Sequence, residues 1–308
     1  MTAPRLLVSV PSEHLRAALG DAPDGVEFIA WDMTVAPPVE SIDMVIVPYM
    51  SSLTLLGRLD QVRTRLVQSQ SDGYDGVYAV LPPGHVFANA ASVHETATAE
   101  LALTLILASQ RGIPDFVRAA REGRWAPGHY PGLADHSVLL VGYGGVGTAI
   151  ENRLAPFEVD IVRVARSART TPRGPVHAIE SLGDLLAHAD VVVVCVPLTD
   201  STRHLIDDSF LARMSDGALL VNVARGPVGD TEALSAHARS GRIRLALDVT
   251  DPEPLPSGHA LYSMPNVLIS PHVGGATPAM TPRLVRLVHA QMERLLRGEE
   301  PLNIVLRS

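Results

Sequence analysis

Lysine is absent from the 308-residue sequence, so arginine supplies all 25 basic side chains. Enzymes that bind a substrate or pyridoxal phosphate as a Schiff base need a lysine amine, and so do P-loop ATPases, which excludes these classes. Arginine carries a planar guanidinium that binds carboxylate and phosphate groups through paired hydrogen bonds. The arginine-only composition therefore suits a ligand that carries carboxylate or phosphate groups.

Cysteine is nearly absent, because Cys195 is the only one. An intrachain disulfide and a disulfide-stapled secreted scaffold are therefore excluded. Cys195 lies in a continuous apolar run, so we expect a buried thiol in a strand rather than a nucleophile. The N-terminal apolar run is too short for a signal peptide, and the apolar stretch 101–108 falls short of the ~20 residues of a membrane span. We expect a soluble, cytoplasmic protein.

Positive charge is in deficit, since the net charge is −8. General binders of nucleic acid or of anionic membranes take their affinity from clustered cations, so neither partner is expected. We also expect no metal. Any anion site must be local, which favours a small-molecule ligand.

The length predicts two domains. The first part of the chain alternates short apolar runs (6–10, 26–31, 44–48, 66–70 and 77–81) with a helical pattern that follows Ser12, a plausible N-cap. Runs without polar alternation indicate strands buried on both faces of a mainly parallel sheet. An alanine- and leucine-rich stretch, 92–111, predicts a long helix between the domains, and the Gly/Pro-rich segment 123–137 predicts an extended arm.

A second βα series follows, with six apolar runs between residues 138 and 271. Their order is typical of a doubly wound nucleotide-binding sheet. A last helix, about 281–296 with Pro282 in its first turn, is expected to return the chain to the first domain. We therefore predict an α/β protein with one domain from residues 1–95 and 282–308 and a dinucleotide-binding domain from residues 96–281.

A glycine turn opens this second series. The pattern GxGxxG follows an apolar strand directly and begins a helix, the arrangement that places a pyrophosphate at a helix N-terminus. The first glycine would permit the tight turn, the second the close approach of phosphate, and the third the packing of helix on strand. The predicted dinucleotide contacts here are Gly142, Gly144, Gly145, Val146 and Gly147.

The end of the next strand predicts the cofactor. NAD enzymes place a carboxylate there to bind the ribose 2′-hydroxyl, but this chain has Arg166, Ser167 and Arg169 instead. Two guanidinium groups and a hydroxyl suit a 2′-phosphate. NADP(H) is therefore favoured, with NAD(H) possible; the alternative is a solvated basic loop without a ligand.

Five motifs follow in order: VGYGGVG, CVPLTDSTRHLI, LLVNVARGPVGDTEAL, LALDVTDPEPLP and SPHVGGAT. Together they resemble the D-isomer-specific 2-hydroxyacid dehydrogenase family over nearly the whole chain, densely between residues 97 and 277. The resemblance implies a flavodoxin-like substrate domain, a Rossmann domain inserted into it, and a homodimer.

The resemblance implies a catalytic set of Arg225, Glu253 and His272. The imidazole can donate a proton to the substrate carbonyl oxygen as hydride reaches the carbon. Glu253 would orient the imidazole and favour its protonated form. Arg225 would bind the substrate carboxylate and polarise the 2-oxo group.

The family resemblance also implies cofactor and substrate contacts at further positions where the motifs match. Asp248 matches the residue that contacts the nicotinamide carboxamide, although a structural cap is the alternative. Contacts with the rest of the dinucleotide are expected from Val196, Pro197, Thr202, Val223 and Ala224. Substrate contacts are expected from Tyr49, Met50, Asp72 and Gly73, where Asp72 departs from the family's small apolar residue.

The sequence thus predicts an NAD(P)H-dependent reductase of small 2-oxo acids such as glyoxylate and hydroxypyruvate. Phosphoglycerate is disfavoured, since the two predicted substrate loops contain no arginine. A non-catalytic dinucleotide sensor of the co-repressor type, which shares fold and catalytic set, is the alternative.

Overall fold

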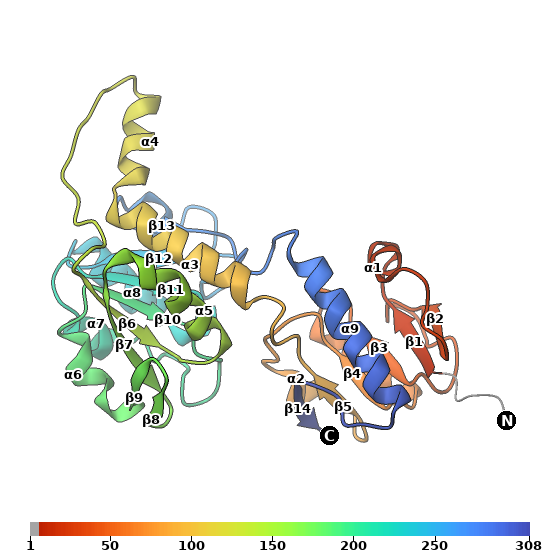
Figure 1. The fold of residues 1–308 in the computed structure, drawn as a ribbon. Coiled ribbons are helices and arrows are strands. Elements are labelled where there is room, and N and C mark those ends of the chain that lie inside the picture. The colour runs from red at the N-terminus through yellow and green to blue at the C-terminus, as the bar shows by residue number, and fades with distance from the viewer. Residues whose placement is uncertain (1–5) are drawn as a thin grey trace. The chain divides into compact units, whose positions relative to one another are not determined.

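The computed structural model describes residues 6–308 and separates into two compact units, drawn in Figure 1. Of the described residues, unit 1 contains 6–94 and Thr277–Ser308, and unit 2 contains Glu95–Ala276. The boundaries predicted from the sequence were after residue 95 and before residue 282.

Unit 1 is built on a six-stranded sheet in the order β14-β5-β4-β3-β1-β2. Its first five strands are parallel, and β14 pairs antiparallel with β5. The order 2-1-3-4-5 is that of flavodoxin-like sheets. The strands are β1 (Leu6–Val10), β2 (Val26–Ala30), β3 (Met44–Ile46), β4 (Leu66–Gln68), β5 (Val86–Ala88) and β14 (Ile304–Arg307).

Helices pack on both faces of this sheet. Ser12 caps α1 (Glu13–Leu19), as predicted, by accepting a hydrogen bond from the Leu15 backbone. The C-terminal helix α9 (Met280–Leu296) joins α1 in one apolar core with β1 and β3. A second core lies under the 3₁₀ segment η1 (Leu53–Gln61) and α2 (Val77–Val80). Both faces are thereby buried, which explains the unbroken apolar runs.

The expected strand at 77–81 is wrong, because these residues form α2. Gly76 enters the helix in the left-handed conformation (φ 73°), and the Leu81 amide donates to the Val77 carbonyl. A run of five apolar residues does not distinguish a strand from one helical turn. The strand is instead β5, a three-residue element that the sequence pattern did not reveal.

Unit 2 contains an eight-stranded sheet in the order β13-β12-β11-β10-β6-β7-β9-β8. All pairs are parallel except the edge hairpin β8–β9. With β6 as the first strand, the order is the doubly wound 3-2-1-4-5-6 pattern extended at both ends. The strands are β6 (Ser137–Val141), β7 (Asp160–Ala165), β8 (Arg169–Thr171), β9 (Gly174–Ala178), β10 (Val191–Val194), β11 (Leu219–Asn222), β12 (Arg244–Leu247) and β13 (Val267–Ile269).

The helices of unit 2 cover both faces of this sheet. Along β6, Leu139 and Val141 belong to one apolar core, and Val138 and Leu140 belong to the other. The long helix expected at 92–111 is α3, which packs beside α5. The helices are α3 (Glu95–Gln110), α4 (Ile113–Arg121), α5 (Gly145–Leu154), α6 (Leu182–Leu186), α7 (Asp208–Arg213) and α8 (Thr231–Arg239), with 3₁₀ turns η2 (Ala155–Phe157), η3 (Ile179–Ser181), η4 (Gly226–Val228) and η5 (Ala260–Ser263).

Helix α4 and the segment after it form the arm. In Figure 1, α4 projects from the body of unit 2, and the chain returns along a long loop to β6. The base of the arm is anchored where Gln110 donates a hydrogen bond to the Gly132 carbonyl (2.6 Å). Tyr130 folds back onto the start of α4, since a Cβ on Gly112 would lie 2.2 Å from its ring. The helix itself had not been foreseen from the sequence.

Candidate active site

The glycine turn lies between β6 and α5 at the carboxyl end of the sheet. Gly142 has φ 106°, a conformation open to glycine, and its amide donates to the Val164 carbonyl (2.9 Å) on β7. A Cβ on Gly147 would lie 2.2 Å from the Gly142 carbonyl oxygen, so only glycine allows the helix this close to the turn. Gly144 faces open space, with no atom within 4 Å of a Cβ placed there. Room beside a helix N-terminus is what a dinucleotide pyrophosphate requires.

Gly145 and Val146 begin α5. Gly145 is exposed beside Gly144, but a Cβ on it would lie 2.9 Å from the Glu95 side chain on α3. Val146 packs on the core between the helices and the sheet. The turn is thus closed on its α3 side and open above Gly144.

The segment after β10 packs against the glycine turn. A Cβ on Gly142 would lie 2.7 Å from the Cys195 carbonyl oxygen, and the Cys195 thiol donates to the Gly142 carbonyl (3.0 Å). Burial raises the pKa of this thiol to about 12, so it is a structural group and no nucleophile. Val196 joins the adjacent core, and Thr202 closes the following loop by donating to the Pro197 carbonyl (2.7 Å).

The predicted ribose loop lies at the end of β7, beside the glycine turn. Arg166 and Ser167 are exposed in the connection from β7 to β8, and Arg169 begins β8. The Arg169 guanidinium donates to the Tyr143 carbonyl (2.5 Å), inside the glycine turn. This connection reverses the chain into the β8–β9 hairpin, which the sequence pattern did not reveal because β8 is short and polar and β9 begins with Gly and Pro.

The three predicted catalytic residues follow the neighbouring strands β11, β12 and β13. Nδ1 of His272 is hydrogen-bonded to Oε1 of Glu253, and the side chains are 29% and 39% exposed. The pair is therefore open to a ligand. Arg225 follows β11, and its guanidinium donates to the Ala224 carbonyl (2.7 Å).

Gly226 allows the Arg225 turn to lie against the loop that carries Glu253. A Cβ on Gly226 would lie 1.8 Å from the Thr250 carbonyl oxygen. The buried Asn222 holds the same turn, because its side chain accepts from the Ala224 amide (3.0 Å) and donates to the Arg225 carbonyl (3.3 Å). Val223 and Ala224 are buried between them. Asn222, at the end of a buried strand, was not singled out in the sequence.

Asp248 holds the loop that carries His272. Its Oδ1 accepts from the Ser270 hydroxyl (2.6 Å) and the Val273 amide (3.0 Å), and its Oδ2 accepts from the Gly274 amide (2.9 Å). The His272 amide also donates to the Asp248 carbonyl (2.8 Å). Asp248 is only 4% exposed, so its carboxylate acts first as a cap for residues 270–274.

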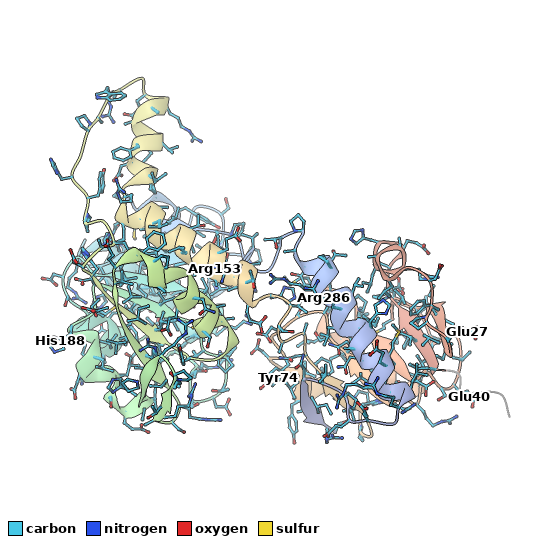
Figure 2. The ribbon with its side chains drawn as sticks, in the orientation of Figure 1. Glu27, Glu40, Tyr74, Arg153, His188 and Arg286 are labelled. Carbon is cyan, nitrogen blue, oxygen red and sulfur yellow. The ribbon has the colours of Figure 1, made fainter. Side chains whose placement is uncertain are left out.

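The predicted substrate residues lie in unit 1, after β3 and β4. The Tyr49 ring stacks on His94 (centroids 5.9 Å apart), burial raises its phenol pKa, and Met50 is 62% exposed. Asp72 accepts from the Asn89 amide at both its carbonyl oxygen (2.7 Å) and its Oδ1 (3.0 Å). Gly73 follows in the same loop, close to Tyr74, which is labelled in Figure 2.

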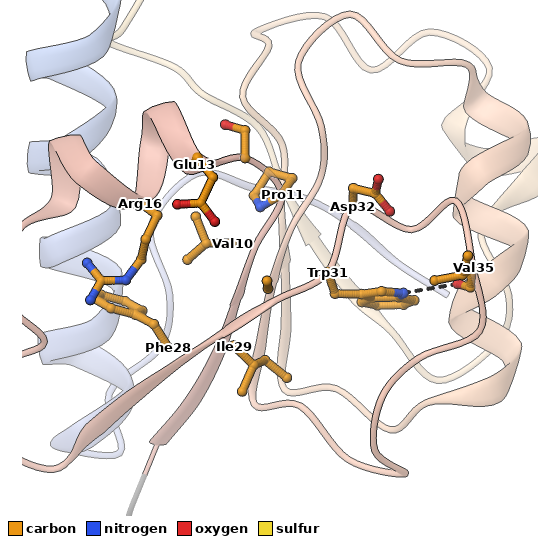
Figure 3. A pocket seen from close by; sticks show the side chains of 11 residues that line it. Val10, Pro11, Glu13, Arg16, Phe28, Ile29, Trp31, Asp32 and Val35 are labelled. Atoms are coloured by element: carbon orange, nitrogen blue, oxygen red, sulfur yellow. Dashed lines mark hydrogen bonds between the residues drawn. The ribbon is translucent and has the colours of Figure 1, made fainter.

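A separate open cavity of about 730 Å³ lies in unit 1 at the ends of β1 and β2 (Figure 3). Arg16 lies over the Phe28 ring at one side of it (4.8 Å), and Trp31 donates to the Val35 carbonyl (3.0 Å) at the other. Its lining contains none of the four predicted substrate residues.

Within residues 6–308 no group of three or more His, Cys, Asp or Glu side chains is arranged to hold a metal ion. Over the same residues, no helix has the length and apolar character needed to cross a membrane.

Dehydrogenases and reductases that act on 2-hydroxy or 2-oxo acids are similar to most of the chain. The family model described as D-isomer specific 2-hydroxyacid dehydrogenase, NAD binding domain, matches residues 103–274. Glyoxylate reductase of Thermofilum pendens is 34% identical over 260 residues, which cover 78% of this chain and 74% of the relative. Human glyoxylate reductase/hydroxypyruvate reductase is 34% identical over 212 residues, covering 66% and 64%.

Solved structures agree with these matches. The D-isomer specific 2-hydroxyacid dehydrogenase from Xanthobacter autotrophicus Py2, crystallised with NADPH and MES, superposes with a TM-score of 0.83 at 31% identity and covers 99% of this chain and 98% of its own. Its likeness extends over both units. The D-mandelate dehydrogenase of Rhodotorula graminis has a TM-score of 0.80 at 25% identity, covering 99% and 98%. The chain therefore belongs to the D-isomer specific 2-hydroxyacid dehydrogenase family.

Proposed function

We propose that this protein is an oxidoreductase that reduces small 2-oxo acids to D-2-hydroxy acids with NAD(P)H. The observation that carries the proposal is the hydrogen bond between His272 and Glu253. This pair lies at the carboxyl edge of the unit 2 sheet, the same edge at which the open glycine turn lies. Ligands of doubly wound sheets bind at this edge. Relatives named glyoxylate reductase support glyoxylate and hydroxypyruvate as the substrate class.

The chemistry assigns one task to each side chain. Arg225 binds the substrate carboxylate through two parallel hydrogen bonds and turns the 2-oxo group toward the cofactor. Nδ1 of His272 faces Glu253, so Nε2 is the nitrogen that donates a proton to the carbonyl oxygen. Glu253 orients the ring through its hydrogen bond to Nδ1. When bound, the reduced nicotinamide supplies the hydride.

Unit 2 is the proposed dinucleotide-binding domain, with NADP(H) preferred. The turn at Gly142–Gly147 would hold the pyrophosphate. The residues that would line the rest of the dinucleotide are Val196, Pro197, Thr202, Val223 and Ala224, and Asp248 would lie near the carboxamide. Arg166, Ser167 and Arg169 would bind the 2′-phosphate. The NADPH complex of the Xanthobacter relative supports this preference.

Unit 1 is the proposed substrate domain, with Tyr49, Met50, Asp72 and Gly73 as its contacts. A carboxylate next to an anionic substrate would be unfavourable. The hydrogen bond from Asn89 to Asp72 Oδ1 reduces this conflict, since it engages the carboxylate with an amide. Homodimer formation and a cytoplasmic location are likewise proposals.

The decisive experiment compares NADPH and NADH oxidation, at equal concentration, with glyoxylate, hydroxypyruvate, pyruvate and phenylpyruvate. We expect the highest kcat/KM with NADPH as cofactor and with either glyoxylate or hydroxypyruvate as substrate. His272→Asn should lower kcat by about 10²–10⁴-fold while NADPH still binds. His188→Asn, at an exposed histidine, is the matched control.

Turnover that survives in His272→Asn would show that the acid/base is misassigned. Tight dinucleotide binding without turnover of any of these acids would instead favour the dinucleotide sensor. The named relatives are reductases and do not support that alternative.

A further inference from the structure

Three polar side chains are buried beneath the glycine turn: Tyr143, Glu151 and Arg163. They come from the turn itself, from α5 and from β7, and they are 7%, 3% and 9% exposed. The Tyr143 hydroxyl donates to Oε2 of Glu151. Arg163 donates to both carboxylate oxygens, from Nε to Oε2 at 2.9 Å and from Nη2 to Oε1. The carboxylate thus joins the turn, the helix and the strand.

This cluster keeps its charges in place. Burial by itself would raise the pKa of Glu151, but the hydrogen bonds from Arg163 and Tyr143 outweigh it and hold that pKa below the usual range. Burial, and then the hydrogen bond to Glu151, raises the pKa of the Tyr143 phenol, so the phenol remains a neutral donor. A buried ion pair is costly to desolvate and adds little stability compared with apolar packing. Compared with apolar packing, the buried Glu151–Arg163 pair therefore contributes a fixed geometry rather than added stability.

The Tyr143 ring connects this cluster to the ribose loop. The guanidinium carbons of Arg163 and Arg169 each lie 5.8 Å from the ring centroid. Arg169 also donates to the Tyr143 carbonyl (2.5 Å). One residue therefore holds Arg169 twice, by its ring and by its backbone.

The partners of Arg169 leave its charge available. A carbonyl and an aromatic ring are neutral, whereas the carboxylate of Glu151 is engaged by Arg163 and lies 3.7 Å from Arg173. Arg169 stands on a three-residue edge strand, where a long side chain would otherwise lose conformational freedom on binding an anion. A guanidinium that is already oriented binds a phosphate at a smaller entropic cost.

We propose that Tyr143, held by Glu151 and Arg163, is a positioning residue that presets Arg169 for the 2′-phosphate of NADP(H). The residue thereby contributes to the preference for NADPH over NADH. This inference rests on the proposed cofactor preference, and it adds a determinant that lies inside the glycine turn, outside the ribose loop.

The test measures binding to the full-length protein by calorimetry, with adenosine 2′,5′-bisphosphate and 5′-AMP as probes. The readout is the ratio of the two dissociation constants, which isolates the 2′-phosphate. Tyr143→Leu should reduce the preference for the bisphosphate about tenfold, from loss of the cation–π contact and of the preset side chain. The ratio of kcat/KM for NADPH over NADH should fall in parallel.

A double-mutant cycle separates positioning from a general effect on folding. Once Arg169 is replaced in Arg169→Leu, adding Tyr143→Leu should change the ratio little. In Arg166→Leu, the matched control at the other loop arginine, Tyr143→Leu should keep its full effect. An equal loss of affinity for both probes, or an effect that persists without Arg169, would overturn the positioning role.

Tyr143→Phe keeps the ring and removes the bond to Glu151, so it serves if Tyr143→Leu does not fold. We expect its preference for the bisphosphate to fall about threefold, and an unchanged ratio in the folded variant would refute the anchoring by Glu151. Wild-type protein that binds both probes equally would refute the NADP preference itself. A wild-type preference that Tyr143→Leu leaves intact would refute only this inference.

Discussion

At the residue scale, Asp248 holds the backbone of the loop that carries His272, a contact that the sequence motifs did not predict. Three donors of the 270–274 loop converge on one buried carboxylate. A carboxylate accepts from all of them, while an asparagine amide presents one accepting oxygen and one donor that faces an N–H group. The loop that carries the proposed acid/base therefore depends on this side chain.

Asp248→Asn should lower both kcat and thermal stability. The unsatisfied amide of the loop costs about 1–3 kcal/mol, and displacement of His272 should reduce kcat about tenfold or more. Thermal unfolding and steady-state kinetics measure the two effects. Asp216→Asn, at a side chain 87% exposed, is the control and should change neither. Normal kcat in a destabilised Asp248→Asn would restrict Asp248 to a structural role.

Cys195 should resist modification in the folded protein. Its pKa of about 12 means that the thiolate, the form that reacts, is nearly absent at pH 8. Iodoacetamide should label the protein only after unfolding, which mass spectrometry detects. Fast labelling of the folded enzyme at pH 8 would contradict the raised pKa of Cys195.

The same thiol predicts a pH dependence of stability. The folded state retains the Cys195 proton up to about pH 12, whereas an unfolded chain releases it near pH 9, the ordinary pKa of an exposed thiol. Between these values the folded state binds more protons, so the free energy of unfolding falls as pH rises. Compared with Cys195→Ala, the wild-type protein should lose stability between pH 8 and pH 10 in denaturant titrations. A difference that stays constant over this range would contradict the raised pKa.

At the element scale, strands that lie in continuous apolar runs were predictable even when short, whereas α2, α4, β5 and the β8–β9 hairpin were not. The glycine turn and α5 were foreseen because an apolar strand, three spaced glycines and a helical pattern occur together. Helix α2 was mistaken for a strand because one apolar helical turn has the same pattern as a short buried strand, and the three residues of β5 do not stand out as an apolar run. At this length local preference is weak and tertiary packing decides.

Gly144 should be needed for dinucleotide binding alone, whereas Gly147 should also be needed for stability. Gly144→Ala places a methyl group in open space, so it should leave thermal stability unchanged while it weakens dinucleotide binding. Gly147→Ala places one 2.2 Å from the Gly142 carbonyl oxygen, so it should cost about 1–3 kcal/mol of stability as well. Calorimetry with NADPH and thermal unfolding separate the two variants. Unchanged NADPH affinity in Gly144→Ala would argue against a phosphate at this turn.

At the scale of the whole molecule, the arm formed by α4 and the loop after it exposes several apolar side chains. Ile113, Phe116, Val117 and Trp125 are 48%, 37%, 48% and 97% exposed. Exposed apolar side chains that gather on one element favour an interaction site there. The homodimer implied by the family resemblance provides an occupant for it.

Light scattering should therefore give a mass of about 66 kDa, twice the 32.8 kDa of one chain. Val117→Glu should shift the protein toward the monomer, because it places a charge in the proposed interface. Val35→Glu, at a valine 63% exposed in unit 1, is the matched control and should leave the mass unchanged. A monomeric wild-type protein would refute the dimer.

The sequence by itself determined the family, the α/β class and the candidate chemistry. Buried strands read as apolar runs, and the glycine turn, Arg225, Glu253 and His272 stand in local motifs whose residue types allow few other uses. Only the tertiary structure decided what holds these residues. The contacts of Asp248 with the 270–274 loop and of Tyr143 with Glu151, Arg163 and Arg169 join separate elements, and they depend on strand order and burial that no local pattern encodes.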